Sequence, residues 1–295
     1  MYRSTTSSFG VSERVNHDAS GFYSSNLYKN IEINKVISKE ENILSEDFKD
    51  KILLGSCENM KELPNNSVHL MITSPPYNVT KEYDQNLNLK DYLNLLKKAF
   101  SESYRVLING GRACINVANL GRKPYIPLAS YVIEIMNEIG FNMRGEIIWI
   151  KTSGAGGSCA WGSWQSASNP SLRDIHEYIL VFSKGDLKRP TKGEDTISKE
   201  DFLEWTKSIW IFSPESAKRV GHPAPFPVEL PYRLIQLYSF KDDIILDPFM
   251  GSGTTAIASI RSKRHYVGYE ICEEYIKLAQ NRIDKEIQPT LFSEI

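Results

Sequence analysis

The sequence lacks several features that would assign its class at once. It has four cysteines in 295 residues, and no two of them form a C-x-x-C pair. This spacing argues against a zinc site or a disulfide framework. No apolar run approaches the roughly 20 residues of a membrane helix, and the Ser-rich N-terminus lacks the apolar region of a secretory signal. We therefore expect a cytoplasmic protein that needs neither a metal nor a membrane.

Net charge is also nearly absent. The chain has 35 Lys and Arg residues against 36 Asp and Glu residues, which gives a formal charge of -1. This balance excludes a histone-like basic protein, and 41% hydrophobic with 24% charged residues excludes a wholly disordered or collagen-like chain. A nucleic-acid partner is still compatible with these values, because binding depends on where the positive charge lies rather than on its sum.

Short apolar runs alternate with amphipathic helical stretches from residue 51 onward. Leu93, Leu96 and Phe100, for example, recur at helical spacing, Asn88 suits a helix start, and Gly110-Gly111 suits a stop and turn. The apolar runs are 3 to 6 residues long, which is typical of buried parallel strands. They cover residues 52–54, 68–73, 114–117, 147–150, 179–182, 244–246 and 266–269. The pattern predicts an α/β fold with a doubly wound, mostly parallel sheet of seven strands.

Three segments depart from this alternation. Residues 1–48 are rich in Ser, Asn, Glu and Lys, and we expect an N-terminal extension that is partly ordered at best. Residues 151–173 form a Gly/Ser-rich insert within the first half of the main domain, 49–183. Residues 184–220 carry mixed charges and precede the second half, 221–295. Long loops in a compact domain are usually functional or disordered.

A glycine-rich loop follows the predicted strand 244–246. Gly251 and Gly253 let the backbone turn sharply and approach a ligand. Glu270 ends the next predicted strand, at a spacing where a carboxylate can bind ribose hydroxyls. The loop also fits a dinucleotide pattern, but Asp247 would repel a pyrophosphate and tolerate the ammonium and sulfonium of S-adenosylmethionine. The loop therefore favours S-adenosylmethionine over a nicotinamide or flavin cofactor, with a merely tight turn as the non-functional alternative.

A second loop, Ser74-Pro75-Pro76-Tyr77, follows the predicted strand 68–73. Two consecutive prolines restrict φ to about -65° and hold the loop rigid. Ligands of α/β enzymes bind at this carboxyl edge of the sheet. Taken alone, the motif is equally compatible with a proline-rich turn around a packed tyrosine.

Together the two loops resemble the signature of the amino-type DNA methyltransferases. The cofactor loop reads Phe249-Met250-Gly251-Ser252-Gly253, and the catalytic loop Ser74-Pro75-Pro76-Tyr77 precedes it, which resembles the β-class order of that family. The segments 176–182 and 222–231 are also similar to family segments, so the resemblance covers about residues 51–285. It implies a methyltransferase sheet with inserted DNA-recognition loops and S-adenosylmethionine as cofactor.

The resemblance also implies a role for each loop. Ser74 and the backbone carbonyl of Pro75 would accept the hydrogens of an exocyclic amino group, beside Pro76, while Tyr77 stacks on a base extruded from duplex DNA. Ser56 stands where many relatives carry an aspartate, so the resemblance implies that the role of that aspartate falls here to Ser56, to another group or to water. The cofactor-binding residues implied are Asp247, Phe249, Gly251, Gly253, Thr254, Glu270, Phe226 and Ser56.

Three functions are compatible with this reading. We favour methyl transfer to N4 of cytosine, because serine at the first loop position is associated with cytosine in the family; adenine N6 is the alternative. A cytosine C5 enzyme would need a nucleophilic cysteine in a Pro-Cys context, and no Pro-Cys dipeptide occurs. The third compatible function is that of a DNA-binding regulator that has the same fold but does not catalyse methyl transfer. We expect the modification enzyme of a restriction system, with a cognate endonuclease as functional partner; a homodimer is left open.

Candidate DNA contacts come from the two interrupting segments. Lys151, Trp161, Trp164 and Arg173 belong to the insert 151–173, and Lys188 and Arg189 to the segment 184–220, where the family order places target recognition. Tryptophans can stack on displaced bases, and basic side chains can contact phosphates. The alternatives are tryptophans that cover apolar surface and a solvated charged loop.

Overall fold

The computed structural model describes residues 5–6, 14–15, 20–36, 40–77, 86–121, 123–152, 167–168, 170, 172, 174–220 and 225–288. The chain divides into two units, Met1–Asn34 and Lys35–Ile295. This boundary falls before the end of the predicted extension, because residues after Asn34 already belong to the larger unit. Leu44, for example, is 1% exposed within the main hydrophobic core.

The smaller unit contains short elements. Strands β1 (Thr5–Thr6) and β2 (Arg14–Val15) pair in antiparallel orientation, and helix α1 spans Ser20–Tyr23. Phe22, Tyr23 and Tyr28 pack edge to face, with ring centroids 5.1 to 5.2 Å apart. These aromatic contacts are the main packing described within this unit.

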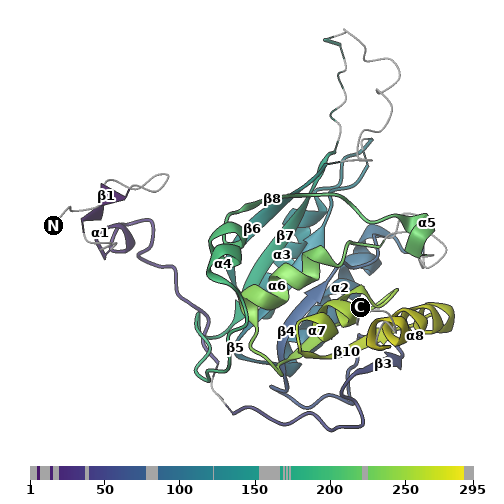
Figure 1. Cartoon of the computed structure of the whole chain (residues 1–295). Helices are drawn as coiled ribbons and strands as arrows, with labels where there is room; N and C mark the ends of the chain where they lie inside the picture. The colour runs from purple at the N-terminus through teal and green to yellow at the C-terminus, as the bar shows by residue number, and fades with distance from the viewer. Residues whose placement is uncertain are drawn as a thin grey trace. The chain divides into compact units, whose positions relative to one another are not determined.

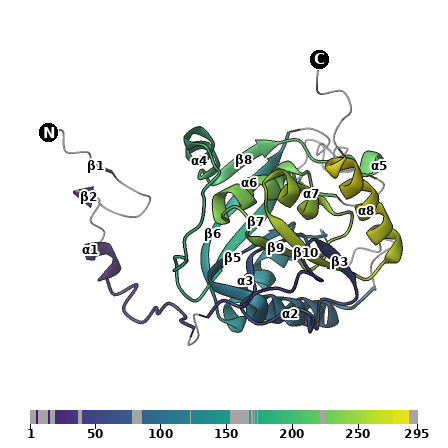
Figure 2. The ribbon, with the colours of Figure 1, turned by 60° about the horizontal axis from the view of Figure 1, so that its bottom comes forward.

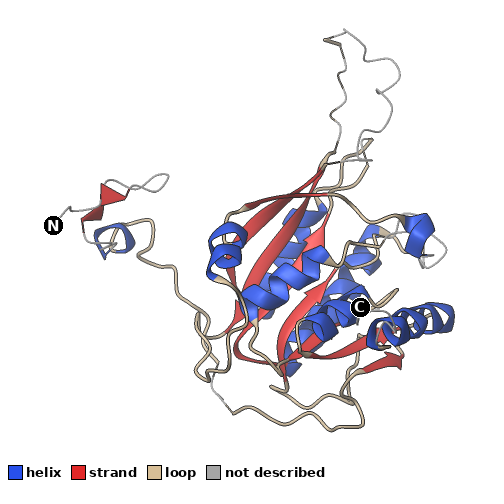
Figure 3. Cartoon of the chain, in the orientation of Figure 1, coloured by secondary structure: helices blue, strands red, loops and turns tan. Residues whose placement is uncertain are grey.

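The described part of the larger unit is built on one sheet of eight strands (Figures 1 and 3). The spatial order is β3-β10-β9-β4-β5-β7-β6-β8, and only β7 runs antiparallel to its two neighbours. The strands are β3 (Lys51–Leu54), β4 (Val68–Thr73), β5 (Leu107–Val117), β6 (Phe141–Lys151), β7 (His176–Lys184), β8 (Ile209–Phe212), β9 (Ile244–Asp247) and β10 (His265–Glu270). The predicted α/β class with a mostly parallel sheet is confirmed, with β8 as an additional edge strand.

Helices cover both faces of this sheet (Figure 2). The described helices are α2 (Leu89–Val106), α3 (Leu128–Ile139), α4 (Lys199–Trp205), α5 (Ala217–Val220), α6 (Glu229–Tyr238), α7 (Thr254–Arg261) and α8 (Glu273–Ile287). On β4, Met71 joins the core with α2 and α3, whereas Leu70 and Ile72 join the core with α6. This alternation follows from the two-residue period of a strand. None of the helices in the described ranges is long and apolar enough to span a bilayer.

The ends of α2 test two local predictions. Asn88 caps the helix as predicted, since its side chain accepts a hydrogen bond from the backbone N–H of Asp91 at 2.9 Å. The prediction of a turn at Gly110-Gly111 is wrong, because β5 begins directly at Leu107 and continues through both glycines. Gly110 has φ +76°, and a Cβ there would lie 2.7 Å from the carbonyl oxygen of Lys188. The glycines therefore allow an irregular strand to pass close to a neighbouring segment.

Between the adjacent strands β4 and β9, the chain reverses the direction in which it adds successive strands to the sheet. The chain leaves β4 through α2 toward β5, and it leaves β9 through α7 toward β10, on the other side of the sheet. The carboxyl ends of these adjacent strands, Thr73 and Asp247, lie together, and the Thr73 hydroxyl donates a 2.7 Å hydrogen bond to the Asp247 carboxylate. Such a reversal opens a crevice where α/β proteins bind ligands.

Candidate active site

A cavity of about 330 Å³ opens at this carboxyl edge. Both predicted loops line it, together with residues from the ends of β3, β6, β7 and β10 and from the loop after β8. The predicted site residues that line it are Ser74, Pro75, Pro76, Tyr77, Ser56, Phe226, Phe249, Gly251, Glu270 and Lys151. The structure thus brings two segments about 175 residues apart to one cavity.

The hydroxyl of Tyr77 anchors the Ser74 loop to neighbouring strands. This hydroxyl accepts a hydrogen bond from the backbone N–H of Ala118 at 3.2 Å and lies 3.4 Å from the Glu177 carboxylate. Burial, followed by the negative charge of Glu177, raises the pKa of Tyr77 well above its usual value of 10.0, so the phenol stays neutral. The tyrosine ring is therefore fixed against β5 and β7.

Three polar side chains complete the wall beside Ser74. The Asn116 Nδ2 atom lies 2.6 Å from Oε2 of Glu177 and 3.4 Å from the Ser74 hydroxyl. Lys151 forms an ion pair with Oε1 of Glu177. The sequence analysis missed Asn116 and Glu177. The available signal for Asn116 was a polar residue inside an apolar strand run, since it lies in the run 114–117. For Glu177, the signal was a charged residue two positions before the run 179–182.

The glycine loop closes the opposite side of the cavity. Gly251 has φ +52°, a left-handed conformation that favours glycine, and its N–H donates a 2.8 Å hydrogen bond to Oε2 of Glu270. The N–H groups of Ile271 and Cys272 bind Oε1 at 3.0 and 2.9 Å. Burial raises the pKa of Glu270, while these three donors oppose the shift. The carboxylate is therefore held rigidly at the cavity wall.

Asp247 lies behind the loop and does not line the cavity. Its side chain is fully buried and accepts hydrogen bonds from the Thr73 hydroxyl, the Thr255 hydroxyl and the Phe249 N–H at 2.7, 2.6 and 3.0 Å. Burial raises its pKa from 3.8 to about 6, against the effect of these donors. These contacts join the end of β4 to the glycine loop, and the cofactor contact of Asp247 stays a prediction.

Gly253 and Thr254 also lie behind the loop. Gly253 has φ +77°, and a Cβ at this position would lie 2.9 Å from the Cβ of Ala279 in α8. Thr254 is 4% exposed, and its hydroxyl accepts a hydrogen bond from Arg282 at 3.2 Å. Both residues shape the start of α7 and its contact with α8, while Gly251 faces the cavity.

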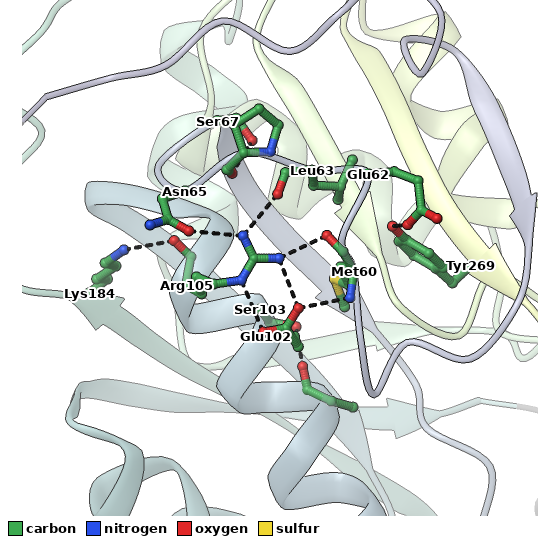
Figure 4. A network of polar contacts seen from close by, with 12 residues as sticks. Met60, Glu62, Leu63, Asn65, Ser67, Glu102, Ser103, Arg105, Lys184 and Tyr269 are labelled. Atoms are coloured by element: carbon green, nitrogen blue, oxygen red, sulfur yellow. Dashed lines mark hydrogen bonds and ion pairs between the residues drawn. The ribbon is translucent and has the colours of Figure 1, made fainter.

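The corner that contains Ser56 is anchored by a polar network (Figure 4). Arg105 donates hydrogen bonds to the carbonyls of Met60 and Leu63 at 2.8 Å each, and Glu102 accepts from the Met60 N–H at 2.7 Å. These contacts fix the segment after β3 on the last turn of α2. Ser56 lines the cavity, and its hydroxyl lies 3.2 Å from the Glu58 carboxylate.

The predicted DNA contacts separate into three groups. Lys151 ends β6 and lines the cavity. Lys188 and Arg189 lie near the opposite edge of the sheet, because β7 is antiparallel and ends next to the start of β5. Arg189 forms an ion pair there with Asp243, and its side chain is 11% exposed. Trp161, Trp164 and Arg173 fall outside the described residues.

Comparison with known proteins supports a common family. The sequence model of the DNA methylase family of N6 and N4 methyltransferases matches residues 68–281. The Type II methyltransferase M.MjaI of Methanocaldococcus jannaschii is 32% identical over 285 residues, which span 79% of this chain and 93% of that protein. The chain belongs to the N6/N4 DNA methylases.

Solved structures agree with this assignment. The structure of TTHA0409 from Thermus thermophilus, complexed with S-adenosyl-L-methionine, matches this DNA methylase with a TM-score of 0.66 and 30% identity, over 80% of this chain and 93% of that one. The cytosine-N4-specific PvuII DNA methyltransferase matches with a TM-score of 0.64 and 20% identity, over 82% and 87% of the two chains. This second likeness supports the fold alone. Within the described residues of the methylase, no three His, Cys, Asp or Glu side chains are grouped as a metal site would require.

Proposed function

We propose that this DNA methylase transfers a methyl group to N4 of cytosine in duplex DNA. The observation that carries methyl transfer is the cavity shared by the Ser74 and Gly251 loops, which are joined behind it by Asp247. The choice of cytosine rests on serine as the first residue of the catalytic loop. A base held at the first loop faces a cofactor held at the second. The relatives named as Type II methyltransferases further support a modification enzyme of a restriction system, with its endonuclease as functional partner.

The residues at the glycine loop fit the methyl donor, S-adenosylmethionine. When bound, this cofactor supplies an electrophilic methyl group on a sulfonium and leaves as a neutral thioether. The fixed carboxylate of Glu270 is placed to accept hydrogen bonds from ribose hydroxyls, and Phe226 and Phe249 give the cavity apolar aromatic surface. Ser56 offers a hydroxyl at the adjoining corner. The cavity wall thus offers both the acceptor and the apolar surface that an adenosine requires.

At the other loop, the residues act on the amino group of the base. The lone pair of an exocyclic amine is delocalised into the ring, so the nitrogen is a weak nucleophile. If Ser74 Oγ and the Pro75 carbonyl accept hydrogen bonds from its two N–H groups, the nitrogen can pyramidalise and direct its lone pair into the cavity. The nitrogen would then form the bond to the methyl carbon as the carbon–sulfur bond breaks with its electron pair left on sulfur, and the extra proton on nitrogen would pass to solvent. The residues contribute mainly by positioning.

The base must leave the duplex to reach this cavity. Extrusion costs a few kcal/mol, which stacking against an aromatic ring can offset. Tyr77 is suited to this contact, because its hydroxyl is already held by Ala118 and the ring needs no further ordering. We assign Tyr77 to stacking on the target base.

Nucleoside analysis tests the proposal directly. Genomic DNA from cells that express the protein is digested to nucleosides, and the methylated nucleoside is identified by mass spectrometry. We expect N4-methylcytosine, and sequencing of the same DNA gives the recognition site. N6-methyladenine without methylcytosine would replace the proposed substrate by adenine, and the absence of both would indicate a DNA-binding protein without turnover.

A further inference from the structure

An ion pair lies in the cavity next to the Ser74 loop. Lys151 is the last residue of β6, and Glu177 is the second residue of β7. Their side chains are 23% and 11% exposed, and both line the cavity. Desolvation of two charges often cancels their attraction, so a pair in this position is weak evidence for a stabilising role. Its place in a ligand cavity suggests a role in recognition.

The carboxylate of Glu177 is engaged on both oxygens. Oε1 contacts the Lys151 ammonium, and Oε2 accepts a hydrogen bond from Asn116 Nδ2 at 2.6 Å and lies 3.4 Å from the Tyr77 hydroxyl. Glu177 is therefore held in place by the protein. Its contacts fix the position of the Lys151 ammonium in turn.

The ammonium of Lys151 still has hydrogens to donate. An ammonium has three N–H donors, and Glu177 is the one acceptor that the described residues provide for Lys151. The Nζ atom also lies 5.4 Å from the centre of the Trp149 ring, which supports a cation without accepting a conventional hydrogen bond. Lys151 thus presents a positioned donor to the cavity.

A chain of contacts links the Ser74 acceptor to the Lys151 donor along the cavity lining. Ser74 Oγ lies 3.4 Å from Asn116 Nδ2, and Asn116 contacts Glu177, which holds Lys151. Cytosine has a complementary order on its pairing edge: the N4 amino donor, then the N3 acceptor, then the O2 acceptor. Adenine has its amino group and N1, but a C–H group at the third position.

We propose that Lys151, positioned by Glu177, donates a hydrogen bond to O2 of the target cytosine while Ser74 accepts from its amino group. The inference rests on the proposed cytosine-N4 function and names the residue that separates cytosine from adenine. A site built to hydrogen-bond one substrate atom rejects an analogue that lacks it, because the buried polar group of the site is then left unpaired.

The test compares two target bases in otherwise identical duplexes. One duplex carries cytosine at the methylated position, and the other carries 2-thiocytosine, in which sulfur, a weaker acceptor, replaces O2. Single-turnover methyl transfer by the wild type is expected to be about 10-fold slower with the thio base, which is the scale of one charge-assisted hydrogen bond. For Lys151→Met, the rate with cytosine should fall about 10- to 100-fold and the two bases should react at nearly equal rates. An unchanged preference in Lys151→Met would overturn the proposal.

A double variant separates recognition from charge neutralisation. Lys151→Met alone leaves Glu177 as an unpaired carboxylate, which can impair the site for a structural reason. Lys151→Met combined with Glu177→Gln removes both charges and keeps a carbonyl acceptor for Asn116. We expect the double variant to stay slow with cytosine; recovery to the wild-type rate would show that Lys151 only neutralises Glu177. Lys241→Met, which removes a lysine paired with Glu194 outside the cavity lining, is the matched control.

The wild-type product separates this inference from the proposed function. If the wild type yields N6-methyladenine, the proposed function fails before any variant is examined. If the wild type yields N4-methylcytosine but Lys151→Met keeps its preference for oxygen over sulfur, the function stands and the role of Lys151 fails.

Discussion

Buried charged groups lie at both the carboxyl ends and the amino ends of the parallel strands, and within the described residues only at the carboxyl ends do they line the cavity that contains Ser74. At the carboxyl edge, Lys151 and Glu177 form an ion pair that lines the cavity beside Ser74. At the amino edge, Arg189 and Asp243 form a pair of similar burial, and Asp243 also accepts from the backbone N–H of Phe240 at 2.7 Å. Burial of a charged pair therefore does not identify a functional site; its access to a ligand does.

The amino-edge pair extends to a half-buried histidine. His69 Nε2 lies 3.6 Å from Asp243, and its Nδ1 accepts from the N–H of Ile244 at 2.9 Å. Burial lowers the pKa of His69, which favours the neutral ring. Because Nδ1 accepts a backbone hydrogen bond, the neutral ring carries its proton on Nε2, facing Asp243. These contacts hold the start of β9 and indicate a structural role for this edge.

Replacement of Arg189 gives the largest expected change in stability. Arg189→Met removes the cation beside the buried Asp243 carboxylate and should lower the free energy of unfolding by about 3 kcal/mol. Affinity for DNA and its dependence on salt should match the wild type, because the guanidinium lies away from the cavity. Urea denaturation and binding titrations at several salt concentrations measure the two effects. A weaker salt dependence would mean that Arg189 contacts phosphate after all.

The buried carboxylate of Asp247 predicts a stability effect that depends on pH. Its pKa is raised from 3.8 in the unfolded chain to about 6 in the fold, so the folded state holds the proton more tightly. The resulting stabilisation is complete below pH 4 and is lost as the pH rises through 6, by about 3 kcal/mol in total. The amide side chain of Asp247→Asn does not titrate in this pH range, so that variant lacks this pH-dependent loss of stability.

Unfolding measurements from pH 4 to pH 7 can detect this difference. The stability of Asp247→Asn relative to the wild type should rise by about 2 kcal/mol over that range. A pH-independent difference between the two proteins would contradict the raised pKa.

Lys188 gives the smallest expected effect. Its side chain is exposed, and its backbone packs against Gly110 near the amino edge. Lys188→Ala should leave DNA affinity and stability nearly unchanged, since a surface substitution of this kind usually shifts stability by less than about 0.5 kcal/mol. A lysine that contacts phosphate would instead reduce the slope of log affinity against log salt by about 1. Such a decrease would show that the amino edge of the sheet also contacts DNA.

The sequence was sufficient to predict the strands and the two loops, because their signals are local. Runs that are apolar on both faces indicate buried strands, and β4 and β9 were found in this way together with the motifs at their ends. The edge strand β8 was missed although its run, residues 209–212, is apolar throughout, because the run lies within the segment 184–220, whose mixed charges indicated an insert. The run also does not reflect burial on both faces: Trp210 is 1% exposed, while Ile209 and Ile211 are 55% and 61% exposed.

Strand direction and side-chain pairing could not be predicted in the same way. An apolar run carries no direction, so nothing indicated that β7 is antiparallel and that the segment with Lys188 and Arg189 leaves at the amino edge. Nor could spacing reveal that the hydroxyls of Thr73, from a distant segment, and of Thr255 donate hydrogen bonds to the Asp247 carboxylate. The cofactor contact predicted for Asp247 assumed that a carboxylate beside the loop faces the ligand.

In the proposed reaction, Ser74 holds the amino group in a cavity shared with the cofactor loop. Single-turnover methyl transfer by Ser74→Ala, with S-adenosylmethionine affinity measured by calorimetry on the same preparation, tests it most directly. Ser101→Ala, which removes an exposed hydroxyl on α2, is the control. We predict cofactor affinity within about twofold of the wild type and methyl transfer reduced about 100-fold or more, as for loss of a preorganised polar contact to a reacting group. Transfer at the wild-type rate would contradict the account.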